Sequence, residues 1–359
     1  WSLPVLLRLT TRVSHSKSVV VRGEPQTGPP VDFTRDIRGR VMVPGNARPA
    51  HRRLREKLRQ VAAWSEAPGC GTRLFPAAGI PALGIIADGV AVSHAREAAP
   101  EAAVLQVRMP HPLPIEAIRQ FVHSVERCMV IEEGDPVLAD ACRAAGLTVD
   151  DKPESFRFGE LNVGRVRRIL AGDASPEPAP PPGKPPELCA GCPHRTVFGL
   201  LRDMGCIVSG DIGCYSLGAL PPFSAMDSCV CMGASIGVGL GLRHVLPEEE
   251  ARRVVSVIGD STFIHSGLTG IAEMVYNPPP TGHVVIILDN QTTAMTGLQE
   301  HPGTGRNLRH EPASRVVLED ACRGLGVPNV VVIDPAKEAE RFAAALAGAL
   351  RGGGLWVII

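Results

Sequence analysis

Short apolar runs alternate along much of the chain with stretches whose apolar residues recur at a helical period. In the first half, apolar runs stand at residues 83–89, 102–109 and 127–134, and helical patterns such as PIEAIRQFVHSVE lie between them. Strands that alternate with helices are typical of a parallel sheet covered by helices. We therefore predict an α/β domain in this half of the chain.

The second half shows the same alternation. The expected strands are residues 206–211, 253–260, 283–290, 329–335 and 355–359. The helical patterns between them include residues 314–326 and 337–353. Parallel strands with helices between them predict a second doubly wound domain. The predicted fold class is thus α/β, with two doubly wound parallel-sheet domains.

Three segments do not follow the strand and helix alternation. Residues 175–187 (SPEPAPPPGKPPE) are rich in Pro and indicate an extended linker between the two domains. The basic stretch before the first domain has the pattern of a connector with a helix at Ala50–Ser65. The opening run Pro4–Leu9 predicts a short buried strand.

Composition excludes some classes of function. The chain has 37 Lys and Arg against 37 Asp and Glu, so no overall charge favours a nucleic acid or an anionic membrane as partner. Gly, Pro, Arg or Asp interrupts every apolar run before it reaches the roughly 20 residues that span a bilayer. The 10 cysteines, with no secretory leader before them, favour a reducing cytoplasm in which thiols stay free or bind metal.

Polar side chains stand where three strands of the second domain end, at residues 210–211, 259–260 and 289–290. Open α/β sheets bind ligands at this edge. Asp260 and Asn290 are separated by one helix and one strand, so their side chains are expected to meet at the tips of adjacent strands. One carboxylate with one amide oxygen suits Mg²⁺, which completes its octahedron with phosphate oxygens and water. A pair of ordinary strand-end turns is the alternative.

The spaced group Gly259-Asp260-Ser261 and Asn290 resembles the thiamine-diphosphate signature Gly-Asp-Gly followed by Asn, with Ser261 in place of the last glycine. Gly259 is expected to let the backbone approach a phosphate closely. Four motifs around it are CAGCPHRTVFGLL (189–201), SGDIGCYSLGALPP (209–222), MDSCVCMGASIGVGLG (226–241) and LDNQTTAMTGLQEHPGTG (288–305). In this order they resemble the large subunit of indolepyruvate:ferredoxin oxidoreductase, a thiamine-diphosphate-dependent 2-oxoacid:ferredoxin oxidoreductase.

The resemblance implies an organisation for the chain. Residues 1–24 would be the remnant of a pyrimidine-binding domain, 25–78 a connector, 79–174 a transketolase-C-like α/β domain, 175–187 the Pro-rich linker and 188–359 the thiamine-diphosphate-binding (PP) domain. The implied enzyme oxidatively decarboxylates an aryl 2-oxoacid such as indolepyruvate to an acyl-CoA and passes the electrons to ferredoxin. The implied cofactors are thiamine diphosphate, Mg²⁺ and [4Fe-4S] clusters, and the implied partners are a small beta subunit, ferredoxin, CoA and the 2-oxoacid.

The resemblance also implies roles for particular residues. Mg²⁺ would be held by Asp260, Asn290 and the backbone carbonyl of Thr292. His194 and Arg195 would be candidates to meet the substrate carboxylate, with helix capping or packing as the alternative. The residues implied to contact the cofactor are Gly210, Asp211, Ile212, Gly213, Cys214, Met232, Gly233, Ala234, Gly259, Asp260, Ser261, Asn290, Thr292, Thr293, Ala294, Met295 and Thr296.

The cysteines fall into two groups. Cys189, Cys192 and Cys214 resemble three ligands of the iron-sulfur cluster nearest the cofactor in related oxidoreductases, and thiolates at such spacing are typical of iron-sulfur ligation. Packing of small buried residues is the alternative. Core packing is expected for the other seven, which are Cys70, Cys128, Cys142, Cys206, Cys229, Cys231 and Cys322.

The family's activating glutamate belongs to the pyrimidine-binding domain, and a ferredoxin-like tail follows the PP domain. Neither is found in these 359 residues. We therefore expect a chain truncated at both ends, which by itself binds Mg-thiamine diphosphate weakly and does not turn over. The alternatives are a non-redox thiamine-diphosphate decarboxylase or carboligase, and a non-catalytic fragment. A nicotinamide-binding protein is disfavoured because no strand is followed by Gly-x-Gly-x-x-Gly.

Overall fold

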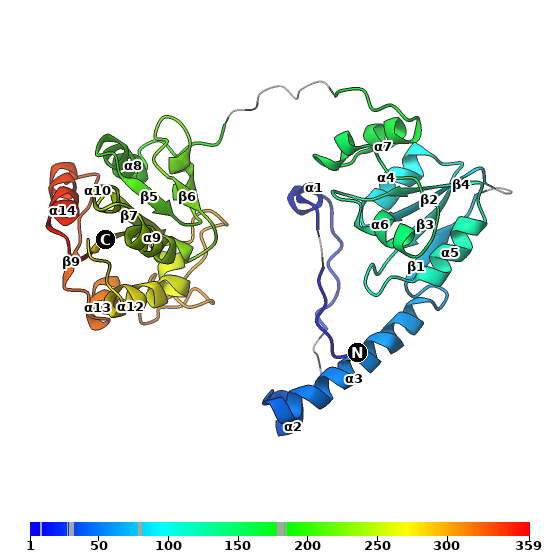
Figure 1. Ribbon diagram of the computed structural model, residues 1–359, viewed down its shortest axis with the longest axis horizontal. Coiled ribbons are helices and arrows are strands. Elements are labelled where there is room, and N and C mark those ends of the chain that lie inside the picture. The colour runs from blue at the N-terminus through cyan, green and yellow to red at the C-terminus, as the bar shows by residue number, and fades with distance from the viewer. Residues whose placement is uncertain (8, 27, 29–31, 78–80, 178–182, 184) are drawn as a thin grey trace. The chain divides into compact units, whose positions relative to one another are not determined.

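A computed structural model describes residues 1–7, 9–26, 28, 32–77, 81–177, 183 and 185–359. The chain divides into two compact units, Trp1–Pro180 and Pro181–Ile359, drawn as ribbons in Figure 1. The predicted linker at 175–187 lies partly outside the described residues.

The first unit contains a four-stranded sheet in the order β1-β3-β2-β4. Strands β2 (Leu83–Asp88), β3 (Ala103–Val107) and β4 (Arg127–Ile131) are parallel, which confirms the three predicted strands. Strand β1 (Thr72–Phe75) is antiparallel to β3 at the edge of the sheet. Strand β1 was not predicted, because its four residues are only partly buried and carry no clear apolar period.

Helices cover both faces of this sheet because successive side chains on a strand point to opposite faces. Ile85 packs in one core with helices α4 (Ala91–Ala98) and α7 (Val163–Leu170). The neighbouring Ile86 packs in another, with α5 (Ile115–His123) and α6 (Val137–Ala144). A short 3₁₀ turn, η1 (Glu154–Arg157), adds the buried ring of Phe156 to the first of these cores.

The N-terminal part of the first unit differs from the prediction. The expected buried strand at Pro4–Leu9 is wrong, since its described residues lie outside any strand and Val5, Leu6, Leu7 and Leu9 are exposed. An apolar run becomes a strand only where another strand offers hydrogen-bonding partners. The helices here are α1 (Thr11–His15), α2 (Ile37–Arg40) and α3 (Pro44–Ser65).

Helix α3 contains the predicted helix Ala50–Ser65 but begins six residues earlier, at Pro44. Proline fits the first turn of a helix, where its missing N–H would have no partner. Pro49 then lies inside the helix, and it is the residue that hid the first turns from the sequence analysis.

The second unit contains a six-stranded sheet in the order β6-β5-β7-β8-β10-β9, with every pair of neighbours parallel. The strand order reverses direction from β5, so the sheet is doubly wound as predicted. The strands are β5 (Ile207–Gly210), β6 (Ser228–Cys229), β7 (Val254–Gly259), β8 (His283–Leu288), β9 (Asn329–Val331) and β10 (Leu355–Ile358). The two-residue strand β6 was not predicted.

Two layers of helices enclose this sheet (Figure 1). Helices α8 (His194–Asp203) and α14 (Ala339–Gly352) pack on one face, and α9 (Ala234–Val245), α12 (Leu268–Tyr276) and α13 (Leu318–Gly324) on the other. Strands β7 and β8 are buried at every position, as expected for central strands covered on both sides. The short helices are η2 (Cys214–Ala219), α10 (Glu248–Ala251), α11 (Asp260–Thr262) and the π-turn η3 (Phe263–Gly267).

Within the described parts of the chain, no helix is both long enough and apolar enough to cross a bilayer.

Candidate functional site

The tips of β7 and β8 lie side by side, as the spacing of Asp260 and Asn290 predicts. The register pairs Gly259 with Leu288, the last residues of the two strands. Asp260 follows directly on β7, and Asp289 and Asn290 follow on β8. Two parallel strands in this register bring an acidic side chain and an amide to the same edge of the sheet.

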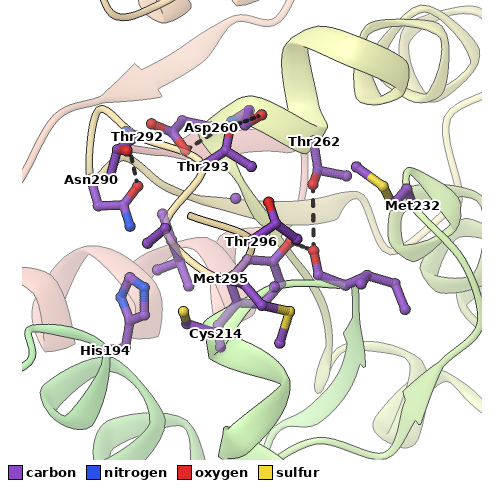
Figure 2. A pocket seen from close by; sticks show the side chains of 17 residues that line it. His194, Cys214, Met232, Asp260, Thr262, Asn290, Thr292, Thr293, Met295 and Thr296 are labelled. Atoms are coloured by element: carbon purple, nitrogen blue, oxygen red, sulfur yellow. Dashed lines mark hydrogen bonds between the residues drawn. The ribbon is translucent and has the colours of Figure 1, made fainter. Parts of the chain in front are cut away.

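A pocket of about 160 Å³ opens at this edge. Figure 2 shows Asp260, Asn290, Thr292 and Thr293 along one side and His194, Cys214 and Met295 across from them. The residues that line the pocket are His194, Ile212, Gly213, Cys214, Tyr215, Met232, Gly259, Asp260, Ser261, Thr262, Leu288, Asn290, Thr292, Thr293, Ala294, Met295 and Thr296.

Most of the predicted cofactor residues lie in this lining. Gly210, Asp211, Gly233 and Ala234 do not, although Asp211 and Gly233 are adjacent in sequence to residues that do. The sequence analysis missed Tyr215, Thr262 and Leu288. Each of these three is next in sequence to a residue that the motifs singled out. This adjacency is the signal in the sequence that could have indicated them.

Asp260 is buried, with 3% of its surface exposed. Burial raises the pKa of its carboxyl above the ordinary value, and the negative charge of Asp289 raises it further. The amide of Ser261, which donates to Oδ1 at 2.8 Å, and the side chain of His301, 3.2 Å from Oδ2, lower that pKa. The buried Asp260 and the exposed Asp289 therefore place two acidic groups at this strand tip, and such a pair favours a cation.

His301 was not found from the sequence. It lies in the loop after β8, and 41 residues separate it from Asp260. Its motif, LDNQTTAMTGLQEHPGTG, was identified as a whole, but no spacing within it indicated that a histidine returns to the strand tip.

Asp211 holds the backbone under the pocket. The side chain is fully buried, and its two oxygens accept hydrogen bonds from the amides of Ile212, Gly233 and Ser235 at 2.8 to 3.1 Å. Gly233 and Ser235 lie at the start of α9, where backbone amides lack partners within the helix. The carboxylate thus fixes the turn that carries Met232, instead of facing the cofactor as the resemblance implied.

The loop after β8 is bonded to the turn after β7. Thr293 donates from its hydroxyl to the hydroxyl of Ser261 at 2.8 Å. A backbone pair closes the loop on itself, because Thr293 and Gln299 form an isolated bridge. Gln291 has a positive φ of 55°, which lets the chain turn sharply after Asn290.

Tyr215 explains two of the pocket's glycines. A Cβ on Gly213 would lie 2.3 Å from the ring, and a Cβ on Gly259 would lie 2.7 Å from it. The ring is buried, and its hydroxyl donates to the carbonyl of Ile212 at 2.9 Å. Gly259 is therefore needed by the protein's own packing, and its approach to a phosphate stays a prediction.

His194 and Arg195 lie at the start of α8 and have different surroundings. His194 lines the pocket and is buried edge-on against Tyr215, with the ring centres 6.2 Å apart. Burial lowers its pKa, which favours the neutral form of the ring. Arg195 lies outside the lining, and its guanidinium donates to the carbonyls of Leu188 and Cys189. It stabilises the Cys189 turn.

Cys189, Cys192 and Cys214 lie close enough to interact electrostatically. Burial raises the pKa of the Cys214 thiol, and the charges of Cys189 and Cys192 raise it further. Among the described residues, no group of three or more His, Cys, Asp and Glu is arranged to hold a metal ion. An iron-sulfur cluster on these cysteines stays a prediction.

The remaining cysteines only partly follow the prediction of core packing. Cys128, Cys142 and Cys322 are buried, and Cys70 and Cys206 are half-buried. The prediction is wrong for Cys229 and Cys231, which are exposed and lie in and just after β6. The helical pattern of their motif begins only at Ala234.

The second unit matches a known protein family over most of its length. Residues 211–359 match the family described as "Thiamine pyrophosphate enzyme, C-terminal TPP binding domain". This part of the chain is therefore similar to the C-terminal domain of thiamine-diphosphate enzymes, and the α/β fold class predicted from the sequence is confirmed.

Curated proteins are similar to this chain over most of its length. The indolepyruvate oxidoreductase subunit IorA of Archaeoglobus fulgidus is 35% identical over 100% of this chain and 61% of its own length. The same subunit of Methanothermobacter thermautotrophicus is 35% identical over 93% of this chain and 58% of its own. The predicted resemblance to this subunit is confirmed, and the chain spans about three fifths of these relatives' length.

Among solved structures, the 2-oxoglutarate:ferredoxin oxidoreductase of Magnetococcus marinus is similar with a TM-score of 0.40 and 17% identity, over 49% of this chain and 64% of that chain.

Proposed function

We propose that the second unit binds thiamine diphosphate through Mg²⁺ held by Asp260, the amide oxygen of Asn290 and the carbonyl of Thr292. The observation that carries the proposal is the buried carboxylate of Asp260 at a strand tip beside Asn290, in a pocket of the thiamine-diphosphate domain. Oxygen ligands with water and phosphate completing the octahedron are what Mg²⁺ prefers.

The charges of the pocket fit a metal-bound diphosphate. No Lys or Arg stands among the described residues that line it, and Asp260 is itself acidic. A diphosphate alone would meet an uncompensated negative charge, whereas a divalent cation between the two removes the repulsion. Asp260 can also bind such a cation. Each of its carboxylate oxygens accepts one hydrogen bond from the protein and keeps a further lone pair for a metal ion.

The rest of the lining suits the other parts of the cofactor. The loop Thr293–Thr296 stands beside the clamp. The hydroxyl of Ser261 accepts a hydrogen bond from Thr293 and would donate its own proton to a diphosphate oxygen. Ile212, Met232 and Met295 give an apolar wall for the ring systems. The neutral ring of His194 can donate a hydrogen bond to a 2-oxoacid in the same cavity.

Thiamine diphosphate, when bound, supplies the carbon nucleophile for decarboxylation of a 2-oxoacid. This chain's residues would bind the diphosphate, orient the cofactor and shield it from water. By relationship to IorA, we propose that the complete assembly oxidises an aryl 2-oxoacid such as indolepyruvate to an acyl-CoA. Ferredoxin would take the electrons, and a small beta subunit and iron-sulfur clusters would complete the assembly. Residues 79–174 of the first unit would be the transketolase-C-like domain.

An activity assay tests the proposed reaction. Residues 1–359 would replace the matching segment of the Archaeoglobus fulgidus IorA, in complex with its partner subunit, and CoA-dependent reduction of a viologen dye would be followed. We expect reduction with indolepyruvate that Asp260→Ala abolishes. Release of an aldehyde without dye reduction would indicate the non-redox decarboxylase instead, and no consumption of any 2-oxoacid would contradict the proposal.

A further inference from the structure

The His301 ring and the Asp260 carboxylate form a buried pair at the candidate metal clamp. Nε2 of His301 lies 3.2 Å from Oδ2 of Asp260, and the two side chains are 6% and 4% exposed. Because both side chains are buried, water does not compete for this hydrogen bond as it does at the protein surface.

The direction of this hydrogen bond follows from the other nitrogen of the ring. The amide of Gly303 donates to Nδ1 of His301 at 3.2 Å, so Nδ1 is an acceptor and carries no proton. In a neutral ring the proton is then on Nε2, which donates it to Asp260. The contact is therefore a hydrogen bond to a carboxylate, of the stronger, charge-assisted kind.

The ring of His301 is held in place independently of Asp260. A Cβ on Gly303 would lie 2.8 Å from Cε1 of the ring, so the glycine leaves the space that the ring occupies. The amide and the hydroxyl of Thr304 both donate to the carbonyl of His301 at 2.9 Å. His301 is thus a fixed donor, and the Asp260 carboxylate adapts to it.

We propose that His301 is a positioning residue for the metal clamp, which fixes the Asp260 carboxylate in its metal-binding orientation. The proposal rests on the proposed function. The Ser261 amide holds Oδ1 and His301 holds Oδ2, so rotation of the carboxylate would break both bonds. Residues that orient a metal ligand through its second polar atom change metal affinity by about 10- to 100-fold.

The test measures binding of Mn²⁺ in place of Mg²⁺ to the whole chain with saturating thiamine diphosphate, by the loss of the free-ion paramagnetic resonance signal. His301→Leu removes the donor, whereas His301→Gln keeps an N–H near the position of Nε2. We expect the Mn²⁺ dissociation constant to rise about 10- to 100-fold in His301→Leu and to stay within about threefold of wild type in His301→Gln.

His310 offers a matched control in the same loop. Its side chain is 74% exposed and pairs with Glu300 at 3.4 Å, away from the pocket lining. His310→Leu should bind Mn²⁺ as the wild type does. Equal losses in His301→Leu and His301→Gln, together with a lower melting temperature in both, would show a packing role and overturn the proposal.

The outcome for Asp260 separates this inference from the proposed function. If Asp260→Asn abolishes Mn²⁺ binding and His301→Leu leaves it unchanged, the clamp stands and His301 does not position it. If Mn²⁺ binding by the wild type is absent or indifferent to Asp260→Asn, the proposed function is overturned, and the role of His301 with it.

Discussion

The carboxylate of Asp211 accepts hydrogen bonds from the backbone amide of Gly233 at 2.9 and 3.0 Å, across 22 residues of sequence. Gly233 has a φ of 87°, a conformation that glycine adopts without strain. A side chain at this position would also collide with Ser266, whose Oγ lies 2.4 Å from the Cβ position. The tip of β5 and the start of α9 are therefore fixed to each other by one buried charge.

Loss of this charge should destabilise the second unit. Asp211→Ala leaves the amides of Gly233 and Ser235 without their acceptor, and we expect a decrease of about 2 to 4 kcal/mol in the free energy of unfolding, since buried donors left unpaired cost about 1 to 3 kcal/mol each. Denaturant titration measures the change. The control is Asp203→Ala at an exposed ion pair with Arg202, which should change stability by less than about 1 kcal/mol. Equal effects of the two substitutions would contradict this role of Asp211.

The hydroxyl pair of Ser261 and Thr293 should act as one unit in cofactor binding. Each single change, Ser261→Gly or Thr293→Val, breaks the same 2.8 Å bond between the two loops. We expect each to weaken Mg-thiamine diphosphate binding about three- to tenfold, which corresponds to roughly 1 kcal/mol for a hydrogen bond. The double variant should bind little worse than either single one. Fully additive losses in a calorimetric cycle would show that the two hydroxyls act separately.

The thiols should differ in reactivity according to burial. Burial raises the pKa of Cys128 to about 12 and of Cys322 to about 11, whereas Cys229 and Cys231 are exposed. Because the thiolate is the reactive form, iodoacetamide at pH 8 should label Cys229 and Cys231 in the native protein within minutes. Cys128 and Cys322 should react only after unfolding. Peptide mass spectrometry measures both, and rapid native labelling of Cys322 would contradict the packing of α13.

His283 should make stability depend on pH. Its ring is fully buried, and burial lowers its pKa to about 3. The Ser256 hydroxyl donates its proton to the carbonyl of Ser235, so the contact between Nε2 of His283 and Ser256 is a hydrogen bond that the ring donates. The unfolded chain takes up a proton near pH 6.5 while the folded chain does not, so stability is complete above pH 6.5 and decreases as the pH falls toward 3.

The decrease from this one group is at most about 1.4 kcal/mol per pH unit. His283→Asn should therefore have a flatter profile of unfolding free energy between pH 6.5 and 5 than the wild type, whatever its absolute stability. Parallel profiles for the two proteins would show that the ring is protonated in the folded state.

The sheets could be predicted from the sequence because their central strands are covered on both faces. Val254–Gly259 and His283–Leu288 are apolar at almost every position, and that pattern has few other interpretations. The edge strands β1 and β6 could not be predicted, because a short, half-exposed strand is specified by its neighbour and not by its own residues.

The residues of the candidate site also divide into those that the sequence could predict and those that it could not. Residues adjacent to strand ends, such as Asp260 and Asn290, were found because strand order and sheet edge follow from the pattern. The roles of Asp211, Tyr215 and His301 depend on contacts between segments far apart in sequence, and such contacts leave no local spacing. For Arg195 the sequence left two roles open, contact with a substrate carboxylate or packing, and its guanidinium donates to the nearby carbonyls of Leu188 and Cys189.

Calorimetric titration of thiamine diphosphate into this chain, with and without Mg²⁺ and repeated on Asp260→Ala, tests whether the buried carboxylate is the metal ligand of a diphosphate site. The proposal predicts binding that requires Mg²⁺ and that Asp260→Ala abolishes. Binding of the same strength without Mg²⁺, or in the Asp260→Ala protein, would contradict it.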